Sequence, residues 1–175
     1  IMSEIPLFKN VENDGLDCRL FGYICDLEER GGFYDASEVY LAKLAQGFAQ
    51  VELPVTKMHL NWQGKVQDGV YATEAAAAAN FAFHTLDKIG VISSLSLHIK
   101  GQAGNGTVLL CEARALEISQ SRIAPGVYEE TYVIEIKITD QNNKLLAKGQ
   151  AEMQEKSDFL YTYAEYLRSI GYAND

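Results

Sequence analysis

Cysteine and histidine are the side chains most often found at nucleophilic and metal-binding sites, and this chain has only three of each. Cys18, Cys25 and Cys111 are an odd number and form no CxxC pair. No histidine stands beside them at a spacing typical of zinc ligands. We therefore predict no metal and no cofactor, and we expect reduced thiols, mostly in the core of a cytoplasmic protein.

The formal net charge of −9 limits the class of ligand. A nucleic-acid surface needs clustered Lys and Arg, so a general nucleic-acid partner is not expected. One anionic ligand is compatible with this charge, because a few basic groups or a helix N-terminus can hold a phosphate. No apolar stretch is long enough to span a bilayer and no secretory leader is evident, which favours a cytoplasmic location without a membrane span.

One segment predicts a long helix whose N-terminus could serve such a ligand. Val70–Lys88 contains the run Ala75–Ala79, and neither glycine nor proline interrupts it before Gly90. Alanine has the highest helix propensity, and a helix that is small and apolar on all sides is usually enclosed by other structure. We therefore predict a central helix wrapped by the rest of the domain.

After Gly90 the hydrophobic period changes to two residues, which is typical of antiparallel strands with one covered face. Four strands are expected there, the last two joined by a turn at Asp140–Asn143: Ser94–Ile99, Thr107–Ile118, Tyr132–Thr139 and Leu145–Met153. A fifth strand, Val55–Asn61, precedes the long helix. Two further helices are predicted, one at about 37–50 from the four-residue spacing of Tyr40, Leu44 and Phe48, and an amphipathic one at Ser157–Ile170.

The expected unit is an antiparallel sheet with one long helix and an open edge, and pairing of that edge with a second copy would give a homodimer. This α+β layout resembles the hotdog fold, in which an antiparallel five-stranded sheet wraps around one central helix. The resemblance covers residues 52–156. Residues 1–51, with the helix at about 37–50, and residues 157–175, with the C-terminal helix and tail, are expected to be additions to that fold.

The loop before the long helix carries the most specific resemblance. The segment Asn61-Trp62-Gln63-Gly64-Lys65-Val66-Gln67-Asp68-Gly69 is similar to the NxxGxxHGG loop of phenylacetyl-CoA-type hotdog thioesterases. Asn61, Gly64 and Gly69 match this motif. Gln67 stands where the family has His, and Asp68 stands where it has the first Gly.

Two strand patterns further along the chain are similar to those of the same family. They lie at Ser94–Ile99 with Gly106, and at Asp140–Gly149. The whole chain also resembles the flagella-coregulated hotdog proteins of epsilon-class proteobacteria.

The resemblance implies that an acyl thioester, in the first place acyl-CoA, binds at this loop. Gly69 would offer a bare backbone N–H to the thioester carbonyl, at a helix end that favours negative charge. A tight turn before the helix is the alternative reason for this glycine. The candidate ligand-binding residues are Asn61, Gly64, Gln67, Gly69, Thr73 and Asn80, and the candidates for the CoA phosphates are Lys65, Lys100 and Arg122.

The catalytic acid of the thioesterase pattern is missing. That pattern has Asp or Glu two helical turns beyond the glycine, where this chain has Ala76, which can be neither nucleophile nor general base. Glu74 falls close to the opposite face at about 3.6 residues per turn. Asn80, on the same side as Ala76, could orient a water or a carbonyl, or be a satisfied buried amide.

Glu74 fits a second hotdog pattern. Gly69-Val70-Tyr71-Ala72-Thr73-Glu74-Ala75 resembles the PGVLxxEA segment of hydroxyacyl-carrier-protein dehydratases, which pair this acid with an upstream histidine. His59 is the candidate partner, although it lies one residue further away than in that pattern and the neighbouring prolines are absent. His59 as base and Glu74 as acid could catalyse a β-elimination. A surface or core role for the histidine is the alternative.

Three hypotheses follow from the sequence. In the first, the protein is an acyl-CoA-binding homodimer with weak or absent thioesterase activity. In the second, it is an enzyme: a thioesterase that uses Glu74 or Asp68, or a dehydratase that uses His59 with Glu74. In the third, it is a regulator whose fatty acyl-CoA occupancy signals lipid state and whose terminal segments contact a partner.

Overall fold

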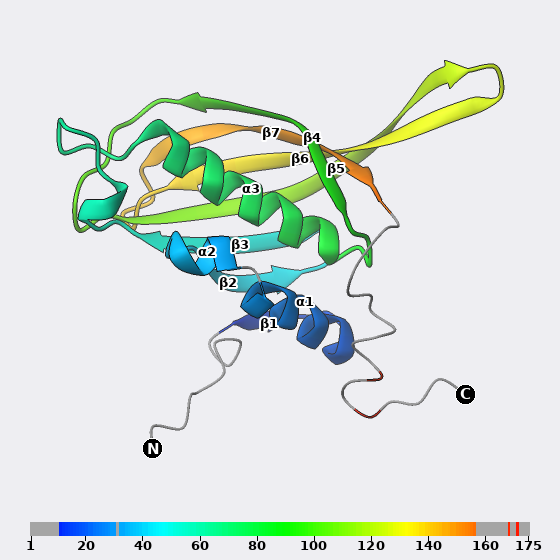
Figure 1. Cartoon of the computed structure of the whole chain (residues 1–175), viewed down its shortest axis with the longest axis horizontal. Coiled ribbons are helices and arrows are strands. Elements are labelled where there is room, and N and C mark those ends of the chain that lie inside the picture. Colours follow the sequence, from blue (N-terminus) through cyan, green and yellow to red (C-terminus); the bar gives the residue numbers. More distant parts are fainter. Residues whose placement is uncertain (1–10, 31, 157–167, 169–170, 172–175) are drawn as a thin grey trace.

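The computed structural model describes residues 11–30, 32–156, 168 and 171, and these form a seven-stranded sheet curled around one central helix (Figure 1). The strand order is β1-β2-β3-β5-β6-β7-β4. In chain order the elements are β1 (Glu12–Asp14), α1 (Cys18–Arg30), α2 (Gly32–Ala36), β2 (Tyr40–Ala45), β3 (Phe48–Pro54), the 3-10 helix η2 (Lys57–His59), α3 (Asp68–His84), β4 (Gly90–Ile99), β5 (Val108–Ala124), β6 (Val127–Thr139) and β7 (Leu145–Glu155).

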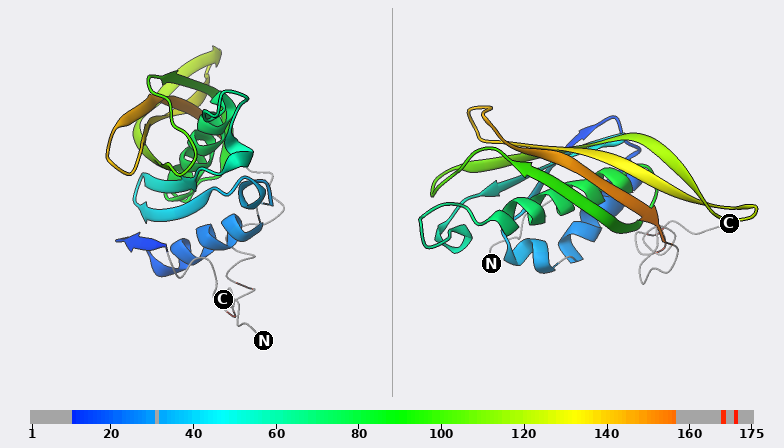
Figure 2. Two further views of the ribbon diagram at one scale, coloured as in Figure 1. Left: turned by 90° about the vertical axis from the view of Figure 1, so that its left-hand side faces the viewer. Right: turned by 90° about the horizontal axis from the view of Figure 1, so that it is seen from above.

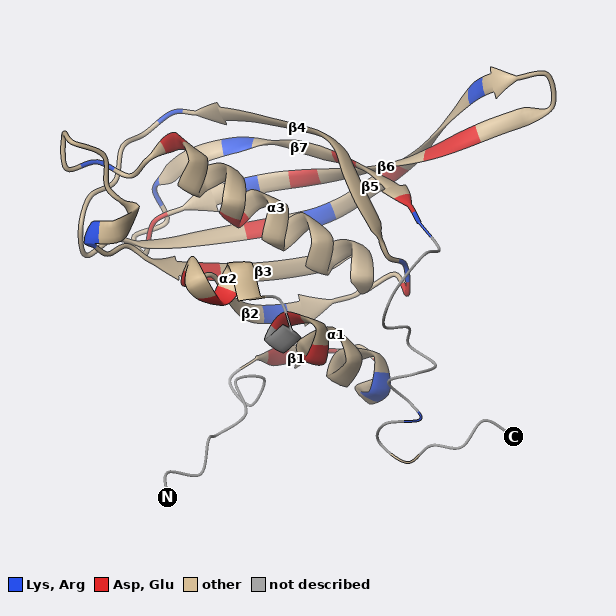
Figure 3. Ribbon diagram, in the orientation of Figure 1, with Lys and Arg blue, Asp and Glu red and all other residues tan. Residues whose placement is uncertain are grey.

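The helix predicted from the alanine run is α3, and the sheet encloses it as expected. Four alanines of the run are fully buried: Ala75, Ala77, Ala78 and Ala79. The two views in Figure 2 show the strands curling around this helix. Asp68 and Glu74 are its only acidic residues (Figure 3). Small side chains permit the close packing of helix on sheet that this arrangement requires.

The four strands predicted after Gly90 are confirmed as β4 to β7. Along β6, Ile134, Ile136 and Ile138 are fully buried on the side of α3, while Glu135 and Lys137 between them are exposed. The alternation read from the sequence therefore separates a covered face from an outer face, as expected of an antiparallel sheet.

The turn predicted at Asp140–Asn143 is also present, between β6 and β7. The Asp140 carboxylate accepts hydrogen bonds from the backbone N–H groups of Asn142 and Lys144, both at 2.9 Å. Asn143 adopts a left-handed φ of 62°, a conformation that asparagine tolerates better than most residues.

The backbones of β4 and β7 approach each other closely at Gly149. Leu97 pairs with Gly149 in the antiparallel ladder, and a Cβ on Gly149 would collide with the backbone carbonyl of Ser96. A glycine is therefore required here by the close approach of two strands. β4 is an edge strand of the described sheet, so its outer side has no strand beside it.

The helix predicted at about 37–50 is wrong, because the chain from Tyr40 onward forms the hairpin of β2 and β3. Residues four apart share a face in a regular strand as well as in a helix, so the spacing of Tyr40, Leu44 and Phe48 could not separate the two. The pairing of β3 with β5 decides in favour of strand. Gly47, with a φ of 68°, makes the turn of the hairpin.

The strand predicted at Val55–Asn61 is also wrong. β3 ends at Pro54, and Lys57–His59 form the single turn η2. Proline has no backbone N–H to donate to a sheet, so it suits the end of a strand. The sheet has seven strands rather than five, because β1 and β2 extend it beyond β3.

The described residues before residue 37, for which no element was predicted, form β1, α1 and α2 in a layer beside β2 (Figure 1). α1 buries Tyr23, Ile24 and Cys25, and β1 pairs with β2 in parallel. The Lys43 ammonium of β2 lies 3.2 Å from the carboxylates of both Glu12 and Asp14. The three-residue strand β1 of this layer forms the edge of the sheet opposite to β4.

β5 and β6 continue past the body of the domain as a two-stranded arm, residues 116–131 (Figure 1). β3 pairs with β5 only as far as Arg114, and β7 pairs with β6 only from Tyr132. Beyond these points the two strands pair with each other. The apolar side chains exposed on or beside the arm are Leu116, Ile118, Ile123, Val127 and Tyr128.

The helix predicted at Ser157–Ile170 lies outside the described residues. None of the described helices combines the length and the apolar character needed to cross a membrane.

Candidate functional site

The loop of residues 61–67 leads into the N-terminus of α3, and its own hydrogen bonds hold its shape. The Asn61 side-chain oxygen accepts hydrogen bonds from the backbone N–H groups of Gln63, at 2.9 Å, and Lys65, at 3.1 Å. Gly64 adopts a left-handed φ of 75° at the turn, a conformation that favours glycine. Asn61 and Gly64 therefore shape the loop.

A pocket of about 430 Å³, which we call the α3 pocket, lies beside the first turns of this helix. Its lining residues are Ser37, Leu53, Met58, His59, Gln67, Gly69, Val70 and Thr73. The structure thus brings together three residues predicted to bind ligand, Gln67, Gly69 and Thr73, with His59. No sequence pattern pointed to Ser37 or Met58, which lie elsewhere in the chain and reach the pocket only through folding.

Gly69 occupies the first turn of α3 and is exposed. Its φ is outside the left-handed region, and a Cβ placed on it would meet no atom of the described residues within 4 Å. Neither a tight turn nor close packing therefore explains this glycine. Gln67, at the N-cap, makes no side-chain capping bond within the described structure, so backbone N–H groups at this end remain available to a ligand.

The side of α3 that the sheet leaves partly open carries Gly69, Thr73, Ala76 and Asn80. The Thr73 hydroxyl donates to the Gly69 carbonyl at 3.0 Å, and the Asn80 amide donates to the Ala76 carbonyl at 2.9 Å. A side-chain hydrogen bond also joins Asn80 to Tyr34. Asn80 is therefore a satisfied, half-buried amide, and Ala76 places no ionisable group on this side.

Glu74 points into the core instead. It is fully buried, and neither carboxylate oxygen has a hydrogen-bond partner among the described residues. Burial raises the pKa of Glu74 well above its usual value, and the nearby negative charge of Glu52 raises it further. Glu74 in turn raises the pKa of the buried Cys111 thiol on β5, after burial itself. Glu74 is not among the residues that line the α3 pocket.

His59 is 4% exposed and both of its ring nitrogens are engaged. Nδ1 accepts a hydrogen bond from the Thr56 backbone N–H at 3.0 Å, and Nε2 lies 3.0 Å from the Ser37 carbonyl, to which it donates in this tautomer. His59 therefore connects η2 to the residues before β2. The histidine lines the α3 pocket and Glu74 does not, so the two residues of the dehydratase hypothesis do not share that pocket.

The candidate phosphate ligands separate into two places. Lys65 and Lys100 line a smaller pocket of about 210 Å³ on another side of the α3 N-terminus, together with Asn61 and the exposed Asp68. Arg122 lies far along the arm, where its Nε donates to the Ala124 carbonyl at 3.4 Å. Within the described part of the chain, no group of three or more His, Cys, Asp or Glu side chains could hold a metal ion.

Comparison with known proteins finds no matching family model and no matching curated protein. Solved structures do match. The PaaI protein of E. coli, from the phenylacetic acid degradation operon, is 19% identical with a TM-score of 0.70, over 82% of this chain and 97% of that chain.

Two further matching structures contain a coenzyme A group. The smu.793 protein of Streptococcus mutans, bound to acetyl CoA, is 18% identical with a TM-score of 0.58, over 67% of this chain and 87% of that chain. A hypothetical thioesterase of Streptococcus pneumoniae with coenzyme A is 20% identical with a TM-score of 0.59, over 68% of this chain and 89% of that chain. This chain has the hotdog fold.

In this hotdog chain the five strands β3-β5-β6-β7-β4 surround α3, and β1, β2, α1 and α2 are added at the edge next to β3. The α3 pocket therefore lies where the added N-terminal residues meet the central helix, since Ser37 precedes β2 and Gly69 lies in the first turn of α3. No pattern in the sequence indicated this contact, since Ser37 fell in the segment predicted as a helix at about 37–50.

Proposed function

We propose that this protein binds an acyl thioester, with acyl-CoA as the ligand, and hydrolyses it weakly or not at all. The observation that carries the proposal is Gly69. Glycine in the first turn of a helix lowers helix stability relative to alanine, and nothing in the described fold requires it. The open space beside it and the uncapped helix N-terminus suit a thioester carbonyl that accepts a backbone hydrogen bond.

The lack of a free general base among the residues that line the α3 pocket supports binding rather than hydrolysis. The position of the family's acid is Ala76, and His59 is the one ionisable residue among those that line the α3 pocket. The hydrogen bonds of both His59 nitrogens leave it without a free lone pair for a proton. A thioester held there would keep its electrophilic carbonyl polarised without a group to activate water.

The two similar structures that contain acetyl CoA and coenzyme A support the choice of ligand. They share the fold with this chain, so a related arrangement of helix and sheet holds a CoA group in those proteins. The unpaired edge of β4 supports a homodimer, in which the sheets of two copies would be continuous.

The test is uptake of acetyl-, hexanoyl- and palmitoyl-CoA by the purified protein, measured by calorimetry and native mass spectrometry. We expect binding of at least one of these, and we expect Gly69→Ala to weaken it by about tenfold, because a methyl group next to the carbonyl costs a hydrogen bond worth about 1.4 kcal/mol. Gly32→Ala is the matched control, since a Cβ there also meets open space and Gly32 is not among the residues that line the pocket. Uptake of none of the thioesters would refute the proposal.

The same variants separate binding from the enzymatic and regulatory alternatives. A hydrolysis assay with the parent, Asp68→Asn and Glu74→Gln would show a thioesterase, and hydration of crotonyl thioesters that is lost in His59→Asn would show a dehydratase. A regulator would retain a partner protein only while the thioester is bound. We expect the parent to bind with negligible turnover, whereas efficient hydrolysis that either acid variant abolishes would overturn the weak-activity part of the proposal.

A further inference from the structure

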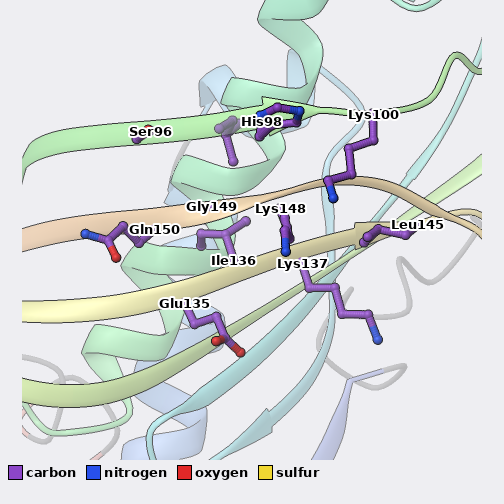
Figure 4. Close-up of a pocket in the computed structure, with 11 residues that line it drawn as sticks. Ser96, His98, Lys100, Glu135, Ile136, Lys137, Leu145, Lys148, Gly149 and Gln150 are labelled. Atoms are coloured by element: carbon purple, nitrogen blue, oxygen red, sulfur yellow. The ribbon is translucent and has the colours of Figure 1, made fainter.

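The outer face of the sheet, opposite to α3, carries a hollow of about 750 Å³ next to the β4 edge (Figure 4). Four residues that line it have basic side chains: His98 on β4, Lys100 just after it, Lys137 on β6 and Lys148 on β7. We call this site the lysine hollow. Ser96 and Gln150 add neutral polar groups, and Glu135 is the one carboxylate among the described residues that line it.

Cross-strand pairing places three of these basic residues side by side. Lys148 is the direct cross-strand neighbour of both His98 and Lys137, so the three form one row across β4, β7 and β6. Like charges directly opposite each other destabilise a sheet. The row ends on β5 with Glu112, the neighbour of Lys137.

The three lysines of the hollow form no ion pair with any described carboxylate. Among the described residues, Lys43 and Lys88 form ion pairs, at 3.2 Å with Glu12 and 3.1 Å with Glu155, whereas Lys100, Lys137 and Lys148 have no carboxylate within 4.0 Å. The chain as a whole carries a net charge of −9, so a concentration of unpaired positive charge in one hollow is unusual for this surface. It suits a ligand that brings several negative charges.

We propose that the lysine hollow binds the phosphate groups of the CoA part of the ligand. This inference rests on the proposed function, because it names the place of one end of the same molecule. Lys100 lines both the lysine hollow and the smaller pocket beside the N-terminus of α3. The lysine hollow and the smaller pocket therefore adjoin at Lys100, and Asp68 of the smaller pocket is the chain neighbour of Gly69 of the α3 pocket. A CoA thioester whose carbonyl lies at Gly69 would extend around the first turn of α3 and past Lys100 to reach the lysines on the outer face.

The backbone holds Lys100 at this junction. The N–H groups of Lys100 and Gly101 both donate to the Leu146 carbonyl, at 2.7 and 3.0 Å, so the chain bends around β7 directly after β4. A Cβ on Gly101 would lie 2.9 Å from the end of the Leu146 side chain, so a larger residue there would require that side chain to shift. The bend carries the chain from the outer face to the helix end, and Lys100 stands between the two.

The test compares ligands with and without the nucleotide part. The double variant Lys137→Gln/Lys148→Gln removes two charges, and Lys144→Gln, an exposed lysine in the β6–β7 turn that is not among the residues lining the hollow, is the matched control. We expect adenosine 3′,5′-bisphosphate and hexanoyl-CoA to bind the double variant at least about tenfold more weakly than the parent, because hydrogen bonds between charged groups are the strong ones. Hexanoyl-pantetheine, which lacks the nucleotide, should bind parent and variants equally.

The outcomes separate this inference from the proposed function. If hexanoyl-CoA binds parent and double variant equally, the lysine hollow is not the phosphate site, and the proposed function stands. If adenosine 3′,5′-bisphosphate binds through the lysines while no thioester binds, the proposed function fails and the hollow remains a nucleotide phosphate site. The melting temperature of the double variant tests for a folding defect. We expect it to be nearly unchanged, because relief of the repulsion between Lys137 and Lys148 offsets the loss of the charge beside Glu112.

Discussion

Glu74 is an acidic side chain that lies fully buried in the apolar core. Burial without hydrogen-bond partners among the described residues disfavours the charged form of this carboxyl group. The pKa of Glu74 is therefore higher in the folded protein than in the unfolded chain. The folded state then binds this proton more tightly than the unfolded state does. Stability from this group is therefore fully present at a pH below the usual carboxyl pKa, and is lost as the pH rises toward the raised value.

Glu74→Gln should remove this dependence. We expect the variant to be more stable than the parent at pH 7.5, on the order of 1 kcal/mol or more, because it no longer requires a proton to enter the core. At pH 3.5, one unit below the usual glutamate pKa of 4.5, the difference should shrink toward zero, since the parent carboxyl is then largely protonated in both states. Urea unfolding of both proteins across this pH range measures the difference.

Glu74→Asp serves as the comparison for that experiment, because it keeps the titrating group and should keep the pH dependence. A Glu74→Gln protein that is less stable than the parent at every pH would contradict the account. It would mean that the carboxylate has a partner that the described residues do not include.

At the scale of elements, the junction of β4 with β7 depends on Gly149. Only a residue without a Cβ allows the Ser96 carbonyl to approach this closely, and both the β4 edge and the lysine hollow lie next to it. The positions of the β4 edge, proposed for dimer formation, and of the lysine hollow, proposed for phosphate binding, therefore depend on this junction.

Gly149→Ala should lower the free energy of unfolding by about 1–3 kcal/mol, the usual cost of forcing extra atoms into a packed site. Thermal and urea denaturation measure the loss. Gly32→Ala is again the control and should leave stability nearly unchanged, because its Cβ meets open space. Equal stability of Gly149→Ala and the parent would show that β4 can move away from β7 at little cost, and that the junction is not tight in solution.

The two edges of the sheet differ in a way that bears on the whole molecule. β1, at one edge, has three residues and lies in the layer of α1, whereas β4, at the other, has ten residues. A long unpaired edge invites pairing with another chain, and short or covered edges discourage it. Two copies are therefore expected to meet through β4.

Light scattering should give twice the chain mass of 19.4 kDa, and the dimer should persist at micromolar concentration. Hydrogen exchange offers a more specific measurement. The amides of Gly90–Ile99 should exchange more slowly as protein concentration rises, while those of β3, inside the sheet, should not respond. Monomeric mass together with fast exchange along β4 at all concentrations would exclude this dimer.

The sequence alone determined the central helix and the four strands after it. The alanine run permits close packing on all sides of the helix. The alternation along the strands specifies which side chains face it. In both cases the local sequence pattern matches the burial of the residues in the folded protein. The same local information placed Gly69 at the start of the helix, and Ala76 and Asn80 on one side of it. The resemblance in the loop before the helix then suggested the fold that the structural comparison confirms.

Only the tertiary structure decided the remaining features, because they depend on contacts between distant segments. Residues 37–50 carry a spacing that fits helix and strand alike, and pairing with β5 selects the strand. Lys137, Lys148 and His98 are ordinary outward positions in the sequence, and the register of three strands makes them neighbours. Asn61 matched a family motif, and its bonds to the loop backbone show that its first role is to shape the turn that presents Gly69.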